Sequence, residues 1–150
     1  MKIISQNKKA FHDYDINEKI EAGIVLTGDE VKSLRAGHSS LVGAFATIHD
    51  GELFLINAHI TPYERAYIRN EKDATRSRKL LVHRKELSRI IGQLSRQGIT
   101  IVALKMYFND RSKVKVELGL AKHKKAASRK QELKERDIAR ETRRELRDKS

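Results

Sequence analysis

Several stretches of the chain alternate between apolar and polar residues, which is the pattern of a half-buried β-strand. Residues 114–120 alternate in this way, and their predicted inward face consists of Val114, Val116, Leu118 and Leu120. Residues 98–108 have the same period, with a predicted inward face of Val102, Leu104, Met106 and Phe108. The polar segment 109–113 between them predicts a hairpin turn.

Two more strands are predicted in residues 44–60, where the pair Asp50-Gly51 separates two apolar runs. Asp-Gly is a strong hairpin signal because both positions of its tight turn need a positive φ. Residues 11–26 predict either one long bent strand or two short ones. The whole pattern therefore indicates a mainly β protein with five or six strands.

A very short helix is predicted over residues 27–37. Thr27 and Glu30 have the spacing of a capping box, and Gly37 stands where a left-handed C-terminal cap would lie. The predicted buried residues of this helix are Val31 and Leu34. Its predicted outer residues are Glu30, Lys32, Ser33 and Arg35. Such a short helix is marginal alone in water, so the rest of the fold must hold it.

A second helix is predicted in residues 83–98 and ends at Gly98. Its apolar positions have the spacing of one helical face and are Leu87, Ile90, Ile91 and Leu94. Its predicted exposed cations are Arg84, Lys85, Arg89 and Arg96. We therefore predict an oligonucleotide-binding-type Greek-key barrel with two or three short helices, whose closure hides the strand edges. A small open α+β sheet fits the same pattern almost as well.

The charge of the 150-residue chain narrows the choice of partner. Its net charge of +12 favours a polyanion, either nucleic acid or, less often, an anionic membrane surface. Aromatic residues make up only 5% and Trp is absent, which argues against a broad base-stacking platform. The sequence contains no apolar run of membrane-spanning length and no secretory signal, so we expect a soluble cytoplasmic protein.

The last part of the chain differs from the rest. Residues 121–150 carry twelve Lys and Arg against six Asp and Glu, and their few large apolar residues form no continuous stripe. We therefore divide the chain into a barrel domain, 1–121, and a basic tail, 122–150, that is disordered when free and helical on a polyanion. A solvated helical extension that binds nothing is the alternative.

The motifs of catalysis and metal binding are missing from the sequence. It contains neither G-x-x-x-x-G-K-[ST] nor G-x-G-x-x-G, and its six histidines lack ligand spacing. Cysteine is absent, which excludes disulfides and thiolate metal sites. Asp29 and Glu30 are adjacent and so point to different sides of a helix. We expect a binding protein without a cofactor or metal.

Six segments in order carry a resemblance to a known family. They are "NKKAFHDYDI" (7–16), "EAGIVLTGDEVKSLRAG" (21–37), "DGELFLINAHITPYE" (50–64), "SRKLLVHRKEL" (77–87), "GITIVALKMYF" (98–108) and "VKVELGLAKHKK" (114–125). This series resembles the small protein B family, the bacterial protein partner of transfer-messenger RNA (tmRNA) in the rescue of stalled ribosomes. The resemblance covers nearly the whole chain.

The resemblance implies a barrel that grips the tRNA-like part of tmRNA, with the short helix 27–37 against the RNA elbow. It implies that Asn7, Glu30 and Arg35 take part in RNA binding. It also implies that the tail enters the empty messenger channel of the ribosome, near the decoding centre. The candidate tail contacts to ribosomal RNA (rRNA) are Lys122, Lys124, Lys125, Arg129, Lys130, Lys134 and Arg136.

The residue types are compatible with these roles but leave alternatives open. Further candidates for tmRNA binding are Lys8, Lys9, His12 and Lys32, with the lysines suited to phosphates. Glu30 could accept from bases, orient Arg35 or only cap its helix. Asn7 and His12 could equally serve turn or strand-end hydrogen bonds.

The chain departs from the family pattern in the tail. His123 replaces a glycine, and Ala127 stands where an aromatic residue or histidine is usual. The main expectation is a monomeric adaptor that binds tmRNA and the ribosome. The alternatives are a general structured-RNA or ribosomal-protein-like module and a metal-dependent RNA-processing enzyme using Asp29 and Glu30.

Overall fold

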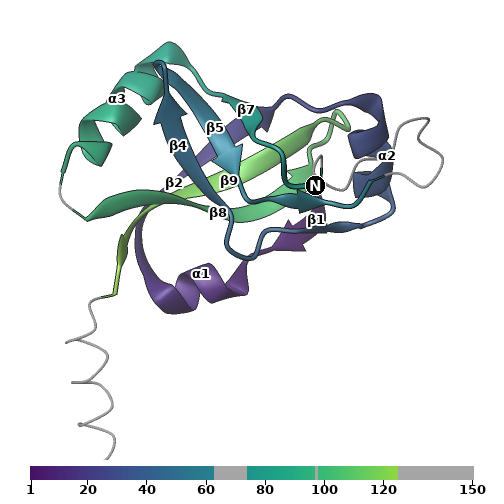
Figure 1. Ribbon diagram of the computed structural model, residues 1–150, viewed down its shortest axis with the longest axis horizontal. Coiled ribbons are helices and arrows are strands. Elements are labelled where there is room, and N and C mark those ends of the chain that lie inside the picture. The colour runs from purple at the N-terminus through teal and green to yellow at the C-terminus, as the bar shows by residue number, and fades with distance from the viewer. Residues whose placement is uncertain (63–73, 97, 125–150) are drawn as a thin grey trace, which may run out of the picture.

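The computed structural model describes residues 1–62, 74–96 and 98–124. Three α-helices and nine strands form within this part of the chain (Figure 1). In chain order they are β1 (Lys2–Gln6), α1 (Lys8–Asp13), β2 (Tyr14–Ile24), α2 (Gly28–Arg35), β3 (Ser39–Ser40), β4 (Phe45–His49), β5 (Glu52–Ile56), β6 (His59–Ile60), β7 (Arg78–Leu81), α3 (Arg84–Leu94), β8 (Ile99–Phe108) and β9 (Val114–His123). The mainly β prediction is confirmed, with more strands than expected.

The main sheet closes into a barrel. Its strand order is β1-β8-β4-β5-β7-β2-β9, and all pairs are antiparallel. Strand β8 also pairs with β9, so the strands β8-β4-β5-β7-β2-β9 form a closed ring. Strand β1 pairs with Lys105–Phe108 of β8, while β4 pairs with Ile101 and Val102 of the same strand. Closure gives every strand of this ring two neighbours, whereas β1 pairs with β8 alone. Of the two architectures that the sequence left open, the barrel is therefore correct and the open sheet is not.

The core fills the interior of this barrel. Val116, Leu118 and Leu120 of β9 are buried in it, as their alternation predicts, and Val114 packs against it. The opposite face of β9 carries Gly119, where an added Cβ would come within 3.0 Å of the Leu104 side chain. A larger residue at position 119 would therefore press on the side chains of Leu104 in β8 and Ile16 in β2.

The inward face predicted for β8 is wrong in part. Met106 and Phe108 lie in the main core, but Val102 and Leu104 pack in a second cluster with Ala10 of α1. The cause is a register shift between Ala103 and Lys105, where a β-bulge reverses the side on which successive residues point. Both faces of β8 are thus buried, one by the barrel and one by α1.

The two predicted hairpin turns are confirmed. Asp50 and Gly51 have φ of 51° and 75°, the left-handed pair that a tight turn between β4 and β5 requires. In the turn between β8 and β9, the Asn109 side chain accepts hydrogen bonds from the backbone of Arg111 (3.0 Å) and Lys113 (2.9 Å). These local interactions fix the registers of the two hairpins.

The N-terminal third contains elements that the alternation did not reveal. Residues Phe11–Asp13, expected in a strand, belong to α1, and β2 is one long strand with a register shift between Ile16 and Glu18. Strand β9 continues through His123, beyond the predicted domain boundary after residue 121, because Tyr14 and Asp15 of β2 pair with it.

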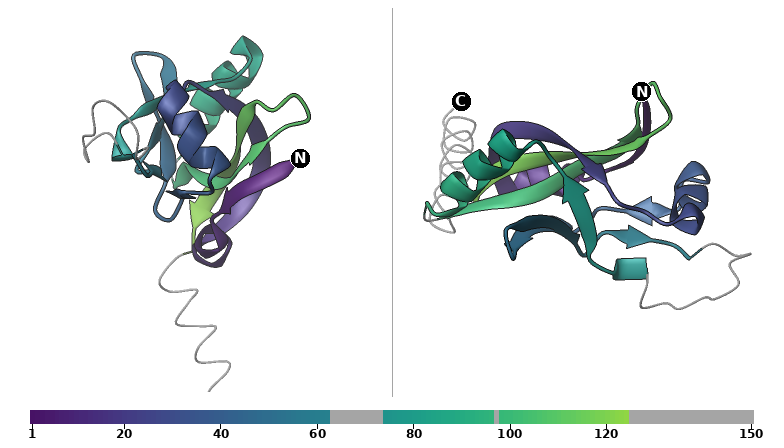
Figure 2. Two further views of the ribbon diagram at one scale, coloured as in Figure 1. Left: turned by 90° about the vertical axis from the view of Figure 1, so that its right-hand side faces the viewer. Right: turned by 90° about the horizontal axis from the view of Figure 1, so that it is seen from above.

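The helices α2 and α3 lie at opposite ends of the barrel (Figures 1 and 2). In α3, Ile90 is fully buried, and Leu87 and Leu94 pack against the core. Ile91 is 42% exposed, so the predicted apolar face is one residue too wide. The expected exposure of Arg84, Lys85, Arg89 and Arg96 is confirmed.

Candidate nucleic-acid interface

The capped helix α2 forms as its sequence predicts. The amide of Glu30 donates to Oγ1 of Thr27 (3.2 Å), and the amide of Thr27 donates to Oε1 of Glu30 (2.9 Å). Gly37 has a φ of 79°, the left-handed conformation expected of the C-terminal cap. Leu34 is buried and Val31 packs against the core, but Ser33, expected on the outside, is also buried. A small side chain at this position lets the helix lie close to the barrel.

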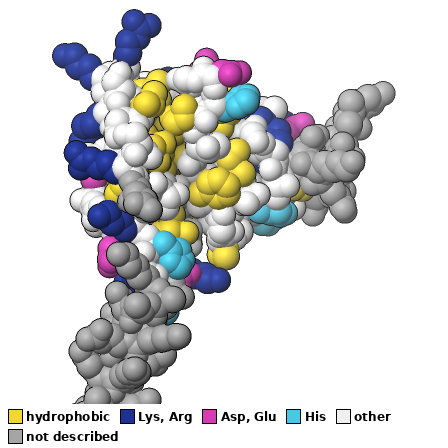
Figure 3. Space-filling model, turned by 60° about the vertical axis from the view of Figure 1, so that its left-hand side comes forward, with side chains coloured by type: hydrophobic (Ala, Val, Ile, Leu, Met, Phe, Trp, Pro, Cys, Tyr) yellow, Lys and Arg dark blue, Asp and Glu magenta, His cyan; other side chains and the backbone are white. Residues whose placement is uncertain are grey.

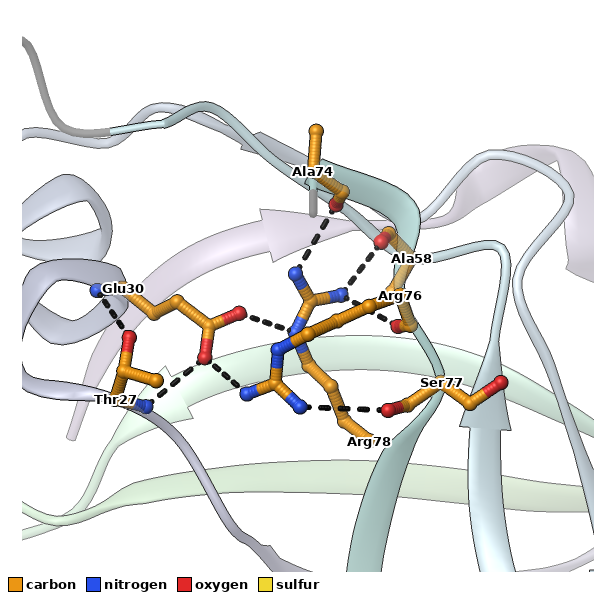
Figure 4. Close-up of polar contacts among 7 residues, drawn as sticks. All are labelled: Thr27, Glu30, Ala58, Ala74, Arg76, Ser77 and Arg78. Carbon is orange, nitrogen blue, oxygen red and sulfur yellow. Dashed lines mark hydrogen bonds and ion pairs between the residues drawn. The ribbon is translucent and has the colours of Figure 1, made fainter. Parts of the chain in front are cut away.

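The prediction that Glu30 lies on the outer face of α2 is wrong. Its carboxylate lies between two arginines, Arg76 and Arg78 (Figure 4). Its Oε2 accepts a hydrogen bond from Nε of Arg78 at 2.6 Å, and its Oε1 accepts from Nη2 of Arg76. Burial disfavours the charged carboxylate, but hydrogen bonds from Arg76, Thr27 and Arg78 and the charge of Arg78 outweigh burial and lower the pKa of Glu30. Glu30 is therefore ionised at neutral pH and orients Arg76 and Arg78.

Arg78 is fully buried, which is unusual for an arginine. Its Nη1 donates to the carbonyls of Ala58 (2.8 Å) and Arg76 (3.2 Å), and its Nη2 donates to the carbonyl of Ala74 (3.0 Å). With Nε on Glu30, the guanidinium joins α2, β7 and the segment after β5 (Figure 4). This network holds α2 on the end of the barrel.

Arg76 and Arg78 are not among the predicted site residues, although the sequence carries a signal for Arg78. Arg78 and Leu80 alternate with exposed Lys79 and Leu81, so the arginine takes an inward position in β7. An inward arginine requires a buried acidic partner. Glu30, the acidic residue of the capping box, is that partner.

Lys32 and Arg35 have exposed side chains on α2. They are the predicted RNA-binding residues that this helix presents to solvent. Their position next to the Glu30 network means that the barrel fixes the direction of the helix that carries them.

Asn7 is buried at the start of α1, and its side chain is used within the protein. Its Nδ2 donates to the carbonyls of Leu41 and Ala103, both at 3.0 Å, and its Oδ1 accepts from the amide of Ala10 at 3.2 Å. The residue is only 4% exposed. Of the two interpretations that the sequence left open for Asn7, the geometry favours turn and strand-end hydrogen bonding over direct RNA contact.

Helix α1 presents a group of exposed residues that Asn7 positions. Lys8, Lys9 and His12 are exposed, and Nδ1 of His12 lies 3.3 Å from Oδ1 of Asp13. Phe11 is 48% exposed, with Nζ of Lys19 5.5 Å from its ring centroid. Helix α1 lies on a different part of the molecule from α2 (Figure 1).

The last described residues before the tail, Lys122–Lys124, lie beside α1. The amide of Lys124 donates to the carbonyl of Asp13 (3.0 Å), and the rings of His123 and Tyr14 meet edge to face with centroids 4.9 Å apart. Lys122 and His123 are exposed in β9. His123 occupies an extended strand, so the chain makes no left-handed turn there. The tail candidates Lys125, Arg129, Lys130, Lys134 and Arg136 lie outside the described residues.

The candidate residues thus form two groups. Lys32 and Arg35 lie on α2, whereas Lys8, Lys9 and His12 lie on α1 near Lys122 and Lys124. Within the described ranges, no group of three or more His, Asp or Glu could hold a metal ion. In that same part of the chain, no helix is long and apolar enough to cross a membrane.

A closed antiparallel barrel with cationic side chains at its ends defines an oligonucleotide-binding-like barrel protein. A family model described as "SmpB protein" matches residues 4–148. The chain therefore belongs to the SmpB family.

Relatives and a solved structure agree with this assignment. The chain is 50% identical over 145 residues to the SsrA-binding protein of Coprothermobacter proteolyticus, covering 97% of each protein. It is 51% identical over 149 residues to the SsrA-binding protein of Pelobacter propionicus, covering 99% of this chain and 97% of that protein. A chain of the solved structure "tmRNA-SmpB: a journey to the center of the bacterial ribosome" has 53% identity and a TM-score of 0.66, over 81% of this chain and 84% of that one.

Proposed function

We propose that the protein binds the tRNA-like domain of tmRNA and delivers it to stalled ribosomes for rescue by trans-translation. The observation that carries this proposal is the identity of about one half to SsrA-binding proteins over nearly the full chain. The similar structure of a tmRNA–SmpB assembly on the ribosome supports it, as does the net charge of +12. The protein acts by binding alone, as a monomer, in the cytoplasm and without a cofactor.

Within this function, we assign the grip on tmRNA to the exposed cations of α2 and α1. Lys32 and Arg35 stand on a helix that the Glu30–Arg78 network fixes in place. Lys8, Lys9 and His12 supply a second group, suited to phosphates. Asn7 and Glu30 support these groups from within the protein, since their polar atoms already have partners.

The basic tail is assigned to the ribosome. It occupies the empty messenger channel near the decoding centre, and we place its start after Lys124, whose amide makes the last contact with the barrel within the described residues. Contacts with rRNA phosphates offset the entropy cost of ordering it.

A competition binding experiment tests the proposal against a general structured-RNA module. Labelled tRNA-like domain is bound to the protein at fixed salt and displaced by unlabelled tRNA-like domain or by a structured RNA of equal length. A large preference for the tRNA-like domain is expected. Equal displacement by both RNAs would favour the general module, because phosphate contacts alone do not distinguish RNAs of equal length.

A further inference from the structure

We propose that His38 and His59 together bind one divalent transition-metal ion, such as Zn²⁺, Ni²⁺ or Cu²⁺, on the outer face of the sheet formed by β3 and β6. The two histidines are distant in the sequence, and only the pairing of β3 with β6 brings them together. This metal site departs from the expectation of a protein without a metal. It lies outside the residues assigned to RNA binding, and the proposed function does not depend on it.

The strand register places both histidines on one face of this sheet. Ser40 pairs with His59. The amide of Thr61 donates to the carbonyl of His38 (3.0 Å), which continues the ladder by one residue. Successive side chains of a strand point to opposite faces, and the buried Ile60 points into the core. His38 and His59 are therefore diagonal neighbours on the other face, where both are exposed to solvent.

The separation of diagonal neighbours suits a shared metal ion. Diagonal positions of an antiparallel pair are about 7–8 Å apart, and their Cβ atoms are somewhat closer. Two histidines four residues apart on a helix have Cβ atoms about 5–6 Å apart and bind one zinc ion together. With metal–nitrogen bonds of about 2.0–2.1 Å, two imidazole side chains can also span the slightly longer diagonal distance.

The chemistry of the site selects the kind of metal. Imidazole suits Zn²⁺, Ni²⁺ and Cu²⁺, whereas Mg²⁺ prefers oxygen ligands. Among the described residues, no third His, Asp or Glu joins the pair, so water fills the remaining positions of the metal. The hydroxyls of Ser40 and Thr61 lie beside the histidines on the same face and can hydrogen-bond to this water.

Both ligands stand on a fixed backbone. The amide of His38 donates to the carbonyl of Ser33 (3.0 Å), which closes the C-terminal end of α2. His59 follows Ala58, whose carbonyl accepts from Nη1 of the buried Arg78 (2.8 Å). A metal ion held by both histidines would therefore join the end of α2 to β6. Because the pair exists only in the folded chain, the ion should stabilise the fold.

Other histidines of the chain provide matched controls. Figure 3 shows histidine side chains at separate places on one face of the molecule. His12 and His49 are exposed, and each lies beside one carboxylate, Asp13 at 3.3 Å and Asp50 at 3.4 Å. They therefore test whether a single exposed imidazole with an acidic neighbour is enough to bind the metal.

Calorimetric titration of the untagged protein with Ni²⁺ tests the site. It is carried out at about pH 7.5, where histidine is ordinarily neutral. The test variants are His38→Gln, His59→Gln and the two combined, and the controls are His12→Gln and His49→Gln. The thermal midpoint of each protein is measured with and without Ni²⁺, and Mg²⁺ serves as the comparison cation.

We expect one strong Ni²⁺ site per chain. Loss of an outer-shell partner alone lowers metal affinity about 10–100-fold, so loss of either histidine ligand should lower it by at least as much. The double variant should lose little more, because one remaining imidazole binds no better than the other exposed histidines. Ni²⁺ should raise the thermal midpoint of the wild type and the controls but not that of the test variants. Mg²⁺ should give no such difference.

Substoichiometric Cu²⁺ gives a further test that needs no variant. In the NMR spectrum of the wild type, this paramagnetic ion should broaden the amide signals of His38 and His59 first. The inference is overturned by broadening centred on other histidines, by a loss of Ni²⁺ affinity in only one of the two single test variants, or by equal affinities in test and control variants. Thermal midpoints without metal that match the wild type show that the variants fold.

Discussion

At the scale of single residues, the carboxylate of Glu30 connects parts of the chain that are distant in sequence. It caps α2 through Thr27, binds Arg76 and fixes the buried Arg78 of β7. A buried ion pair contributes little net stability when intact, but removing one partner leaves the other charge uncompensated. Glu30 thus supports the fold through Arg78 and fixes the position of α2, which carries the candidate residues Lys32 and Arg35.

Replacing Glu30 should therefore destabilise the whole fold. We expect Glu30→Ala to lower the free energy of unfolding by roughly 3–5 kcal/mol, because Arg78 stays buried without its acidic partner. The control is Glu52→Ala, which breaks the exposed Lys79–Glu52 pair and should cost at most about 1 kcal/mol. Urea denaturation measures both. Equal, small decreases in the two variants would refute the role given to Glu30.

The lowered pKa of Glu30 makes a separate prediction for acid. Because the pKa is lower in the folded than in the unfolded state, the stabilisation is complete above the unfolded value of about 4.3 and is lost as pH falls through the folded value. The difference in unfolding free energy between wild type and Glu30→Gln should thus shrink as pH falls below about 4. A difference that is constant or grows on acidification would contradict this linkage.

Arg35 is the residue on which the tmRNA contact is best tested. Its side chain is exposed on α2 and can offer a planar fork of donors to a phosphate or a base edge. We expect Arg35→Ala to weaken binding to the tRNA-like domain by roughly 1–3 kcal/mol without changing thermal stability. A gel-shift titration measures the affinity, with Arg84→Ala as an equal-charge control on another helix. Unchanged affinity in the Arg35 variant would remove this residue from the interface.

At the scale of elements, α1 shows how one buried polar side chain positions a candidate binding surface. Asn7 joins the start of α1 to β8 and to the turn before β4, and it directs the exposed Lys8 and Lys9 outward. Asn7→Ala would remove one donor from each of two carbonyls, although that of Leu41 still accepts from the amide of Ala44 (2.9 Å), and it would remove the N-terminal cap. The helix of six residues has no other side-chain cap at this end.

We therefore expect Asn7→Ala to lower stability by roughly 2 kcal/mol or more, the sum of a missing cap and missing buried hydrogen bonds. Binding to the tRNA-like domain should weaken only as far as α1 is displaced. Affinity measured in conditions where the variant is fully folded separates the two effects. A decrease in affinity equal to that of Lys8→Ala with Lys9→Ala, at unchanged stability, would instead make Asn7 a direct RNA contact.

The elements that the sequence predicted are those fixed by local interactions. The α2 caps and the Asp50-Gly51 hairpin depend on residues within one turn, and both formed as expected. The bulge in β8 depends on its pairing with β9, and Glu30 depends on Arg78, 48 residues away. Such partners become neighbours only when the barrel closes, so single-residue patterns do not reveal them.

At the scale of the whole molecule, the candidate RNA-binding residues lie at separate places on the barrel. The long β2–β9–β8 ladders form a continuous wall, whereas β7 completes the barrel through short pairings with β2 and β5. Helix α2 and its arginine network lie at one end. Helix α1 and the last residues of β9 lie together elsewhere on the surface, where the tail begins. We therefore expect that mutations can abolish tmRNA recognition and ribosome binding separately.

Deletion of residues 125–150 should separate binding from rescue. The cut leaves β9 and the Lys124–Asp13 hydrogen bond intact, so the barrel should keep its stability and most of its affinity for the tRNA-like domain. Tagging of stalled nascent chains should be abolished, because the truncated protein has no tail to bind rRNA phosphates. A full-length variant tests charge directly, with glutamine at Lys125, Arg129, Lys130, Lys134 and Arg136. Neutralising Glu132, Glu135 and Asp137 is its control and should preserve tagging. Tagging by the truncated protein would contradict the role given to the tail.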